Sequence, residues 1–465
     1  MTWANGARFF SPDYGLMAGR LADAVQGSGP LLVDIVDGRF WVYADGVWRA
    51  EDGEIRRRVV QLLGERYRPA HYRTLHEMLL SDVERFTMAP VPAYINVRNG
   101  LLVWRGDPDP HLIEHNAECP STVQLPIAWE PLARCPRFDA FLESALPPDE
   151  VDRAWEVIGY LMMSGNPMQR MFLIEGSGGN GKGVFLNVIR AMLGAENFAA
   201  VELHDLSENR FASADLYGKL ANICGDIDAT FIEKTGKIKQ LSGDDVMRAE
   251  RKGEDGFGFK WWGKAIFSAN AIPGTSDSSV GWTRRWEVLR FPYAPTVPDS
   301  SLSKRITDEE LPGIAVKAVD ALRRLITAGR FSSGESRERA HAEFADKANK
   351  VRRWLDDPES GVERTQGEIF NKGTTLLKAF RAWEEHDSGS RVHTGVQRFN
   401  ELCRQAGLMP VTKRGTRGYY GAHITRAPFG IPPQDHVWLN YESGAPRSAP
   451  PDDREPAQQA LDLRV

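Results

Sequence analysis

The hydrophobic and polar positions in the first quarter of the chain change their period several times. Residues 31–48, LLVDIVDGRFWVYADGVW, alternate around two Asp-Gly pairs, which predicts a small β-meander. Apolar residues at helical spacing predict helices over residues 54–67 and 70–83. Residues 94–104 then predict a hairpin that turns at an Asn-Gly pair.

Short apolar runs dominate the middle of the chain. Residues 138–164 have helical spacing, and the runs at residues 172–174, 220–224 and 265–268 predict buried strands. The first of these strands leads through a glycine-rich stretch into an apolar helix. The expected core positions of the helical stretch are Phe138, Phe141, Leu142, Trp155, Ile158 and Leu161.

The last part of the chain is more polar. Residues 335–354, ESRERAHAEFADKANKVRRW, form a charged helical pattern that we interpret as a solvated or subunit-bridging helix. Residues 366–426 predict a small winged helix, with helices over 374–386 and 396–406 and a hairpin after them. Residues 428–465 are rich in Pro, Asp and Arg, which predicts a flexible tail.

Composition sets few limits on the function. The chain has 465 residues, of which 42% are hydrophobic and 26% charged, and its net charge of -5 gives no global basic field for nucleic acid. It contains neither a run of about 18 apolar residues nor a signal peptide, so we expect no membrane partner and a cytoplasmic location. The four cysteines are scattered, which argues against a disulfide framework. A metal site of His111, His115, Cys119 and Cys135 stays open, although the spacing fits no standard motif.

A phosphate-binding loop is the strongest chemical signal. In MFLIEGSGGNGKGVFLNVIRAML, residues 171–193, Gly176 is followed after four residues by Gly181 and Lys182, which is the Walker A spacing. Backbone N–H groups of such a loop surround the phosphates of ATP, and the lysine adds a positive charge that is unfavourable at a helix N-terminus without an anion. The residues expected to contact the nucleotide are Gly176, Ser177, Gly178, Gly179, Asn180, Gly181, Lys182, Gly183 and Val184.

Later positions can complete an ATP site. The apolar strand at residues 220–224 is followed by two carboxylates, of which Asp226 is the first choice for an Mg²⁺ ligand and Asp228 the second. Asn270 follows the next apolar strand, and its amide can hydrogen-bond both the γ-phosphate and the attacking water. Arg284 and Arg285 precede another apolar strand, where they can reach a neighbouring subunit's γ-phosphate as an arginine finger.

The order of these motifs resembles the superfamily 3 helicases, specifically the phage, plasmid and poxvirus-type primase-helicases. The matching segments are GSGGNGKGVF (176–185), LANICGDI (220–227), IKQLSGDD (238–245), ERK (250–252), FSANAIP (267–273) and GWTRRW (281–286). Apart from the Walker A loop no single segment is specific, but six in this order are. The resemblance extends upstream to the accessory domain and covers most of residues 60–430.

This resemblance implies an α/β fold: an AAA+-like P-loop ATPase core with an N-terminal α+β accessory domain and a C-terminal winged helix. The expected domains are a β-rich segment (1–60), the accessory domain (61–150), the ATPase (151–330), a linker helix (331–365), the winged helix (366–427) and the tail (428–465). The implied activity is that of a replicative DNA helicase of a phage or mobile element, which uses ATP and Mg²⁺. It implies a ring, in the form of a hexamer, that moves 3′ to 5′ on single-stranded DNA in a bacterial host, with forked DNA and a separate primase or polymerase as partners.

DNA contacts are expected at two places. We interpret residues 247–262, MRAERKGEDGFGFKWW, as a hairpin that projects into the channel of the ring. Its Arg248, Arg251 and Lys252 would contact phosphates there, and the basic turn of the winged helix would grip the DNA backbone. The residues of that turn are Lys413, Arg414 and Arg417. A surface hairpin with scattered charges and a protein-docking winged helix stay open as alternatives.

Gly183 stands where a Ser or Thr normally binds Mg²⁺ in this motif. The metal would then depend on phosphate oxygens, waters and Asp226. Because only residues 1–60 precede the accessory region, we expect no primase activity in this chain. Two other functions remain: an ATP-switched origin-binding or loading factor with little unwinding, and a P-loop kinase of a small molecule.

Overall fold

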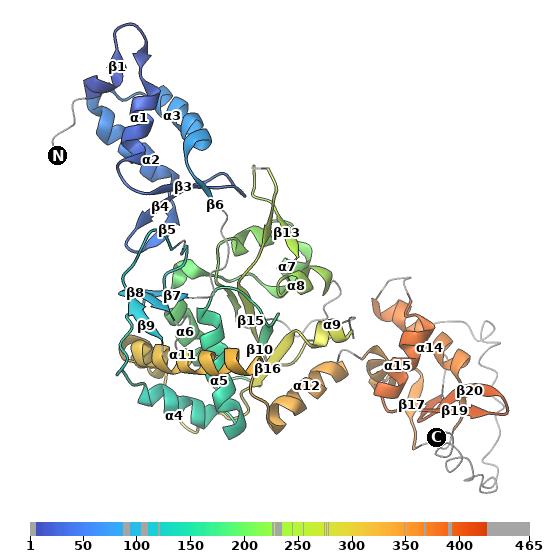
Figure 1. The fold of residues 1–465 in the computed structure, drawn as a ribbon. Helices are drawn as coiled ribbons and strands as arrows, with labels where there is room; N and C mark the ends of the chain where they lie inside the picture. The colour runs from blue at the N-terminus through green and yellow to red at the C-terminus, as the bar shows by residue number, and fades with distance from the viewer. Residues whose placement is uncertain are drawn as a thin grey trace, which may run out of the picture. The chain divides into compact units, whose positions relative to one another are not determined.

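The computed structural model describes residues 6–86, 94–103, 110–119, 121–225, 227, 235–243, 245–253, 255–273, 275, 277, 279–347, 349–366, 369–388 and 393–425. The chain divides into two compact units, residues 1–348 and 349–465, which are described one after the other (Figure 1). In neither unit do the described residues include a helix long and apolar enough to cross a membrane.

The first unit begins with three helices beside a small sheet. The helices are α1 (Ala18–Gln26), α2 (Asp52–Leu63) and α3 (Pro69–Asp82), and the sheet has the order β5-β4-β3-β6. Its strands are β3 (Leu31–Asp34), β4 (Phe40–Ala44), β5 (Val47–Ala50) and β6 (Arg85–Phe86), preceded by the short pair β1 (Phe10–Ser11) and β2 (Gly15–Leu16). The predicted meander is confirmed, since β3, β4 and β5 pair antiparallel in sequence order. Asp45 and Gly46 turn the second connection with positive φ angles of 51° and 82°, as a two-residue hairpin turn requires.

A second small sheet follows. The predicted hairpin is present as β7 (Tyr94–Val97) and β8 (Gly100–Val103). A third strand, β9 (His111–Ile113), pairs with β8 in a stretch for which the sequence predicted no strand. All three residues of β9 are exposed, so this edge strand carries no apolar alternation that could have revealed it.

The centre of the unit is a five-stranded parallel sheet with the order β11-β12-β15-β10-β16, and it is consistent with a P-loop-like α/β core. The strands are β11 (Phe198–Ala199), β12 (Ala221–Cys224), β15 (Lys264–Ala269), β10 (Met171–Glu175) and β16 (Trp286–Arg290). Alternate residues of each strand face opposite ways. In β10, Phe172 and Ile174 enter one core cluster, whereas Met171 and Leu173 enter the other.

Helices cover both faces of this sheet. On the side of Phe172 and Ile174 lie α4 (Pro136–Ala145), α5 (Pro148–Met162), α6 (Lys182–Leu193), α10 (Leu302–Glu309) and α11 (Leu311–Ala328). Of these, α5 and α11 run side by side (Figure 1). The other side carries α7 (Leu203–Glu208), α8 (Thr235–Gln240), α9 (Val280–Thr283) and α12 (Glu335–Lys347), together with the hairpin β13 (Val246–Ala249) and β14 (Phe257–Lys260). The six core positions expected between residues 138 and 164 are all buried.

Helix α12 corrects one expectation. We expected its charged sequence to be solvated or to bridge subunits, but Ala340 and Phe344 are buried at 1% and 2% exposure. The ring of Phe344 lies 5.6 Å from that of Trp286 in β16. An apolar pair at i and i+4 is therefore enough to bury one face of a helix that is otherwise charged.

The second unit has its own core. Its elements are α13 (Lys350–Asp356), β17 (Val362–Arg364), β18 (Asn371–Lys372), α14 (Gly373–Ser388), α15 (Val396–Gln405), β19 (Met409–Lys413), β20 (Thr416–Tyr420) and β21 (Ala422–Ile424). The two predicted helices correspond to α14 and α15, and the predicted hairpin to β19 and β20, which join β18 in one sheet. The expected tail lies outside the described residues.

Candidate functional site

The glycine-rich loop lies between β10 and α6, at the edge of the parallel sheet where the strands end. We call this the carboxyl edge and the opposite one the amino edge. Gly178, Gly179 and Gly181 have φ angles of 102°, 66° and 91°, which residues with a side chain rarely adopt. The loop thus turns sharply enough to direct its backbone toward a ligand at the N-terminus of α6.

Two glycines are also required by close packing. A Cβ on Gly176 would lie 2.6 Å from the carbonyl oxygen of Phe291, and one on Gly181 would lie 2.7 Å from the ring of Phe141 in α4. Gly183 differs, because a Cβ there would meet nothing within 4 Å. The missing hydroxyl at this position is therefore not a consequence of crowding.

Lys182 is the first residue of α6 and is only 8% exposed. Its Nζ donates to the carbonyl oxygen of Gly176, to Oδ1 of Asn270 at 3.1 Å and to Oδ1 of Asn180 at 3.4 Å. Asn180 in turn donates from Nδ2 to the carbonyl oxygen of Phe291, just beyond β16. The ammonium group is thus fixed by oxygen atoms from the loop and from the neighbouring strand.

Asn270 comes directly after β15 and is exposed. The structure therefore brings together two of the residues proposed from the sequence, since β10 and β15 are neighbours in the sheet. Its amide stands beside the lysine, where a bound phosphate could contact both groups.

Asp226 and Asp228, the expected Mg²⁺ ligands, lie outside the described residues. Their neighbour Ile227 is described, and its backbone N–H donates to the carbonyl oxygen of Ser268 in β15 at 2.8 Å. Ile227 thus lies beside β15, the strand that ends directly before Asn270. Among the described residues, no group of three or more His, Cys, Asp or Glu side chains gathers as a metal site. His115 belongs to the other possible metal site, with His111, Cys119 and Cys135. Its Nε2 contacts the carbonyl oxygen of Val97 at 2.9 Å.

A cavity of about 500 Å³ opens beside the loop, within the size range of ligand sites. One wall is the loop itself, and a second is the end of α4 with Phe141 and Ala145. The third wall follows β16 and includes Tyr293 and Val297, which are 50% and 79% exposed. Sequence reasoning missed this wall, and the only available signal was apolar side chains in a proline-rich segment without periodicity.

Arg284 and Arg285 lie at the amino edge. The strand that follows them, β16, runs parallel to β10, with Trp286 opposite Met171 and Arg290 opposite Glu175. Five residues of strand separate the arginine pair from the level of the loop, which is about 16 Å at a rise of ~3.3 Å per residue. The two arginines are therefore far from the loop of their own chain.

The two arginines differ in their surroundings. Arg285 is partly buried and donates to the carbonyl oxygen of Gly281, and its Nε is buried without a partner in the described part of the chain. Burial and the adjacent Arg284 lower the pKa of its guanidinium. Arg284 is exposed and makes a 3.3 Å hydrogen bond to Oε1 of Gln169. Arg284 is thus the member of the pair that is presented outward.

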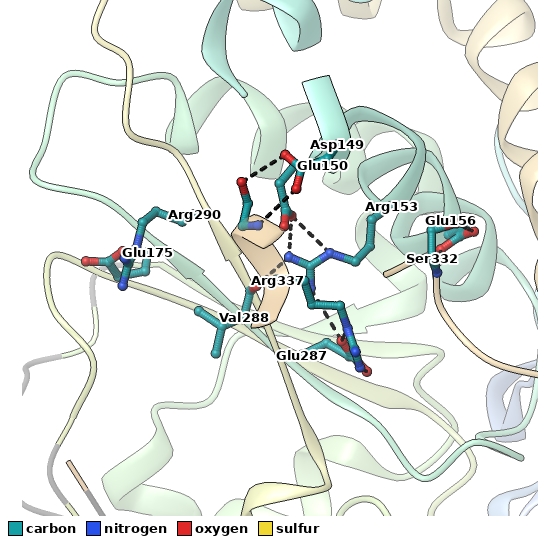
Figure 2. A network of polar contacts seen from close by, with 11 residues as sticks. Asp149, Glu150, Arg153, Glu156, Glu175, Glu287, Val288, Arg290, Ser332 and Arg337 are labelled. Carbon is teal, nitrogen blue, oxygen red and sulfur yellow. Dashed lines mark hydrogen bonds and ion pairs between the residues drawn. The ribbon is translucent and has the colours of Figure 1, made fainter. Parts of the chain in front are cut away.

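A buried ionic network surrounds Glu287 of β16, the strand that begins directly after this pair (Figure 2). Glu287 in β16 is 1% exposed, and its carboxylate accepts from Arg337 of α12 at 2.9 Å twice and from Arg153 of α5 at 3.4 Å. Arg170 adds a third ion pair at 3.3 Å. Although burial opposes ionisation, these arginines together lower the pKa of Glu287. Glu150 forms an ion pair with Arg153, but there burial prevails over the nearby arginines and raises the pKa.

A comparison with protein families concerns this same region. A family model described as "Family of unknown function (DUF5906)" matches residues 174–285, which include the loop, Asn270 and both arginines. Over 154 residues the chain is 25% identical to "Putative helicase L207/L206" of Acanthamoeba polyphaga mimivirus. This chain is thus distantly homologous to that viral protein. The matched stretch is 32% of the chain but only 16% of its relative's length.

Two solved structures match a larger share of the chain, at a lower sequence identity. "The A form apo structure of NrS-1 C terminal region-CTR" is 13% identical, with a TM-score of 0.48, and the match covers 86% of this chain and 98% of that one. A second apo structure of the NrS-1 C terminal region is 12% identical, with the same TM-score and the same coverage.

The expected DNA-contacting hairpin is present as β13 and β14, but its three cations differ. The side chain of Arg248 is 79% exposed and lies 3.4 Å from Glu250, and Lys252 is exposed. Arg251 instead forms an ion pair of 3.3 Å with Asp37 and lies 4.7 Å over the ring of Phe257. Two of the three side chains are thus available to a ligand, and the third, in the connection between the two strands, is engaged with Asp37.

The basic turn of the second unit joins β19 to β20. Arg414 and Gly415 occupy it with positive φ angles of 46° and 78°. Lys413, Arg414 and Arg417 are all exposed. We call these three exposed residues the cationic tip of the second unit.

Proposed function

We propose that this chain is the ATP-hydrolysing subunit of a DNA helicase, which assembles as a ring and moves 3′ to 5′ along single-stranded DNA. One observation carries the proposal. Lys182 Nζ is held by oxygen atoms of Gly176, Asn180 and Asn270 at the N-terminus of a helix, beside a ligand-sized cavity. A phosphate that entered this position would meet the lysine, the asparagine amide and the backbone N–H groups of the loop.

The cavity suits ATP in its two chemical halves. Its loop wall is polar and would hold the triphosphate, whereas Tyr293 and Val297 offer an apolar surface for the base. Asp226, with Asp228 as the second candidate, would supply the carboxylate for Mg²⁺ in place of the hydroxyl absent at Gly183. The bound metal would neutralise charge on the phosphates, while Asn270 would orient the attacking water.

The position of Arg284 supports a ring. The arginine is exposed at the amino edge, about 16 Å along the sheet from the loop of its own chain at ~3.3 Å per residue. As an arginine finger, Arg284 would therefore serve the loop of an adjacent subunit. We therefore propose that each ATP site is completed by the neighbouring copy, in a hexamer by analogy with the family that the sequence resembles.

Lys182→Ala tests the site. We expect ATP hydrolysis to fall by about 10²- to 10³-fold or more, because the fixed cation beside the phosphates is lost. The control is Lys304→Ala, which removes an exposed lysine that pairs only locally with Asp308. The measurement is steady-state phosphate release with and without single-stranded DNA. Full activity of Lys182→Ala would refute the assignment, and an enzyme indifferent to DNA would favour a small-molecule kinase.

A second candidate function rests on the cationic tip of the second unit. Exposed Lys413, Arg414 and Arg417 could hold duplex DNA while ATP drives assembly, as in an origin-binding or loading factor. Such a protein would form ATP-dependent oligomers on duplex DNA. It would not separate a forked substrate, whereas a helicase would, and this assay decides between the two.

A further inference from the structure

A second cleft lies between the N-terminal sheet and the ATPase core. It measures about 360 Å³ and shares no lining residue with the cavity beside the loop. Its walls come from β4 and β5 on one side, and from the segments around Asn197, Lys219 and Arg251 on the other. It is therefore separate from the proposed ATP site.

Four cations line this cleft. Arg39 and Arg49 come from the N-terminal sheet, and Lys219 and Arg251 come from the core. Of the three acidic residues that also line it, Asp37 is already shared between Arg39 at 3.6 Å and Arg251 at 3.3 Å. Arg49 has no ion pair within the described ranges and is partly exposed. Glu51 and Glu196 are the other two carboxylates, so the four cations exceed the three carboxylates by one, and this balance suits an anionic ligand.

Three aromatic side chains also line the cleft. Trp41, Trp48 and Tyr217 contribute to the walls. Trp48 Nε1 donates to the carbonyl oxygen of Ala117, but Trp41 Nε1 is buried with no hydrogen-bond partner among the described residues.

The cleft also touches the hairpin. Arg251 lines it and lies in the connection between β13 and β14, with its guanidinium over the ring of Phe257. Exposed Arg248 and Lys252 lie on the same hairpin. A strand held at the hairpin could therefore continue into the cleft, following positive charge.

We propose that this cleft binds one nucleotide unit of single-stranded DNA, with its phosphate at Arg49 and its base against the aromatic wall. The proposal rests on the helicase function proposed above. Guanidinium groups that track the backbone and aromatic groups that contact bases are the usual means of binding a single strand. A cleft of 360 Å³ is of nucleotide size and too small for duplex.

The test is fluorescence anisotropy with a labelled oligo-dT strand, without ATP, over a series of salt concentrations. Arg49→Glu should weaken binding by about tenfold, and Arg49→Met should lower the salt slope by about 0.7 through the loss of one phosphate contact. Arg49→Met keeps an aliphatic side chain, so the test still gives a result if Arg49→Glu does not fold. The matched control is Arg56→Glu, the same change at an exposed position of α2 whose side chain contacts Tyr67 outside the cleft.

The outcomes separate this proposal from the helicase proposal. If wild type unwinds DNA but both Arg49 variants bind it with wild-type affinity and salt slope, the cleft proposal fails and the helicase proposal stands. If the wild type binds no single-stranded DNA, both fail. Free dTMP is a further arm, because complete competition by the mononucleotide at the strand's own affinity would show that the ligand is a free nucleotide and overturn the proposal.

Discussion

The two edges of the central sheet use charge in opposite ways. At the carboxyl edge, Lys182 is held by neutral oxygen atoms at the opening of a 500 Å³ cavity. At the amino edge, Glu287 is 1% exposed and is paired with three arginines. Lys182 at one edge is thus available to a ligand, whereas the charge of Glu287 at the other is compensated within the protein.

This difference separates chemistry from positioning. A cation that is to bind phosphate must not be cancelled by an internal carboxylate, while a buried carboxylate is tolerated only when cations surround it. The network at the amino edge joins β16 to α5 and α12, and β16 begins directly after the arginine pair. We infer that the network fixes the base from which Arg284 projects.

The largest expected effect concerns Arg284 itself. Arg284→Ala should lower kcat for ATP hydrolysis by about 10³-fold or more, as the loss of an arginine finger does. Arg285→Ala should lower it far less, because Arg285 is turned toward the carbonyl oxygen of Gly281. Phosphate release by the assembled protein is the measurement.

Mixing makes this prediction specific for an adjacent subunit. Arg284→Ala and Lys182→Ala are each expected to be inactive, but in a mixed ring some interfaces would combine an intact loop with an intact Arg284. Partial activity should therefore return on mixing. If the mixture stays as inactive as either variant, Arg284 does not act between subunits and the contrast between the edges loses its functional meaning.

The second effect concerns stability. Glu287→Gln should cost about 3–5 kcal/mol of unfolding free energy, because buried arginines lose their counter-charge. Urea unfolding followed by circular dichroism is the measurement. The control is Glu335→Gln on α12, which removes an 84% exposed carboxylate and should change stability by about 0.5 kcal/mol or less. Equal effects of the two substitutions would show that the network contributes nothing special.

The same carboxylate predicts a pH dependence. The arginines lower the folded-state pKa of Glu287, so its contribution is complete above the unfolded value of about 4.3. It is lost as the pH falls through the lower folded-state pKa. The stability of Glu287→Gln should therefore fall less steeply than that of wild type below about pH 4.3. Parallel curves would contradict this assignment.

The sequence predicted best what is local. The strands around Leu173, Ile223 and Phe267 and the loop before Lys182 were found because each is a continuous apolar run or a motif of a few residues. The hydrogen bond between Lys182 and Asn270 spans 88 positions, but two strands that end at one edge already implied it.

Pairings across long separations were beyond such reasoning. Glu287 meets Arg153 across 134 positions, and Arg251 meets Asp37 across 214 positions. A charged residue in a sequence carries no mark of its partner, and the expected role of Arg251 as a phosphate contact took no account of Asp37. The wall at Tyr293 escaped for a different reason, since an irregular segment has no period to detect.

The smallest expected effect is that of Gly183→Ser, which tests whether Mg²⁺ binds at the carboxyl edge beside α6. A side chain at Gly183 has open space within 4 Å, so Gly183→Ser should fold normally and add the hydroxyl that usually binds Mg²⁺ in this motif. We expect hydrolysis equal to wild type or up to about threefold faster, with half-maximal activity at lower Mg²⁺, because one more oxygen ligand is present. Gly183→Ala is the matched control, since it also removes the destabilising effect of a glycine in a helix, about 0.5–1 kcal/mol, but adds no hydroxyl.

A lower Mg²⁺ requirement in the serine variant alone would show that the metal binds beside α6, at the same edge as Lys182. A serine variant less active than the alanine variant would mean that the metal lies elsewhere and that Gly183 keeps space for something other than a ligand of magnesium.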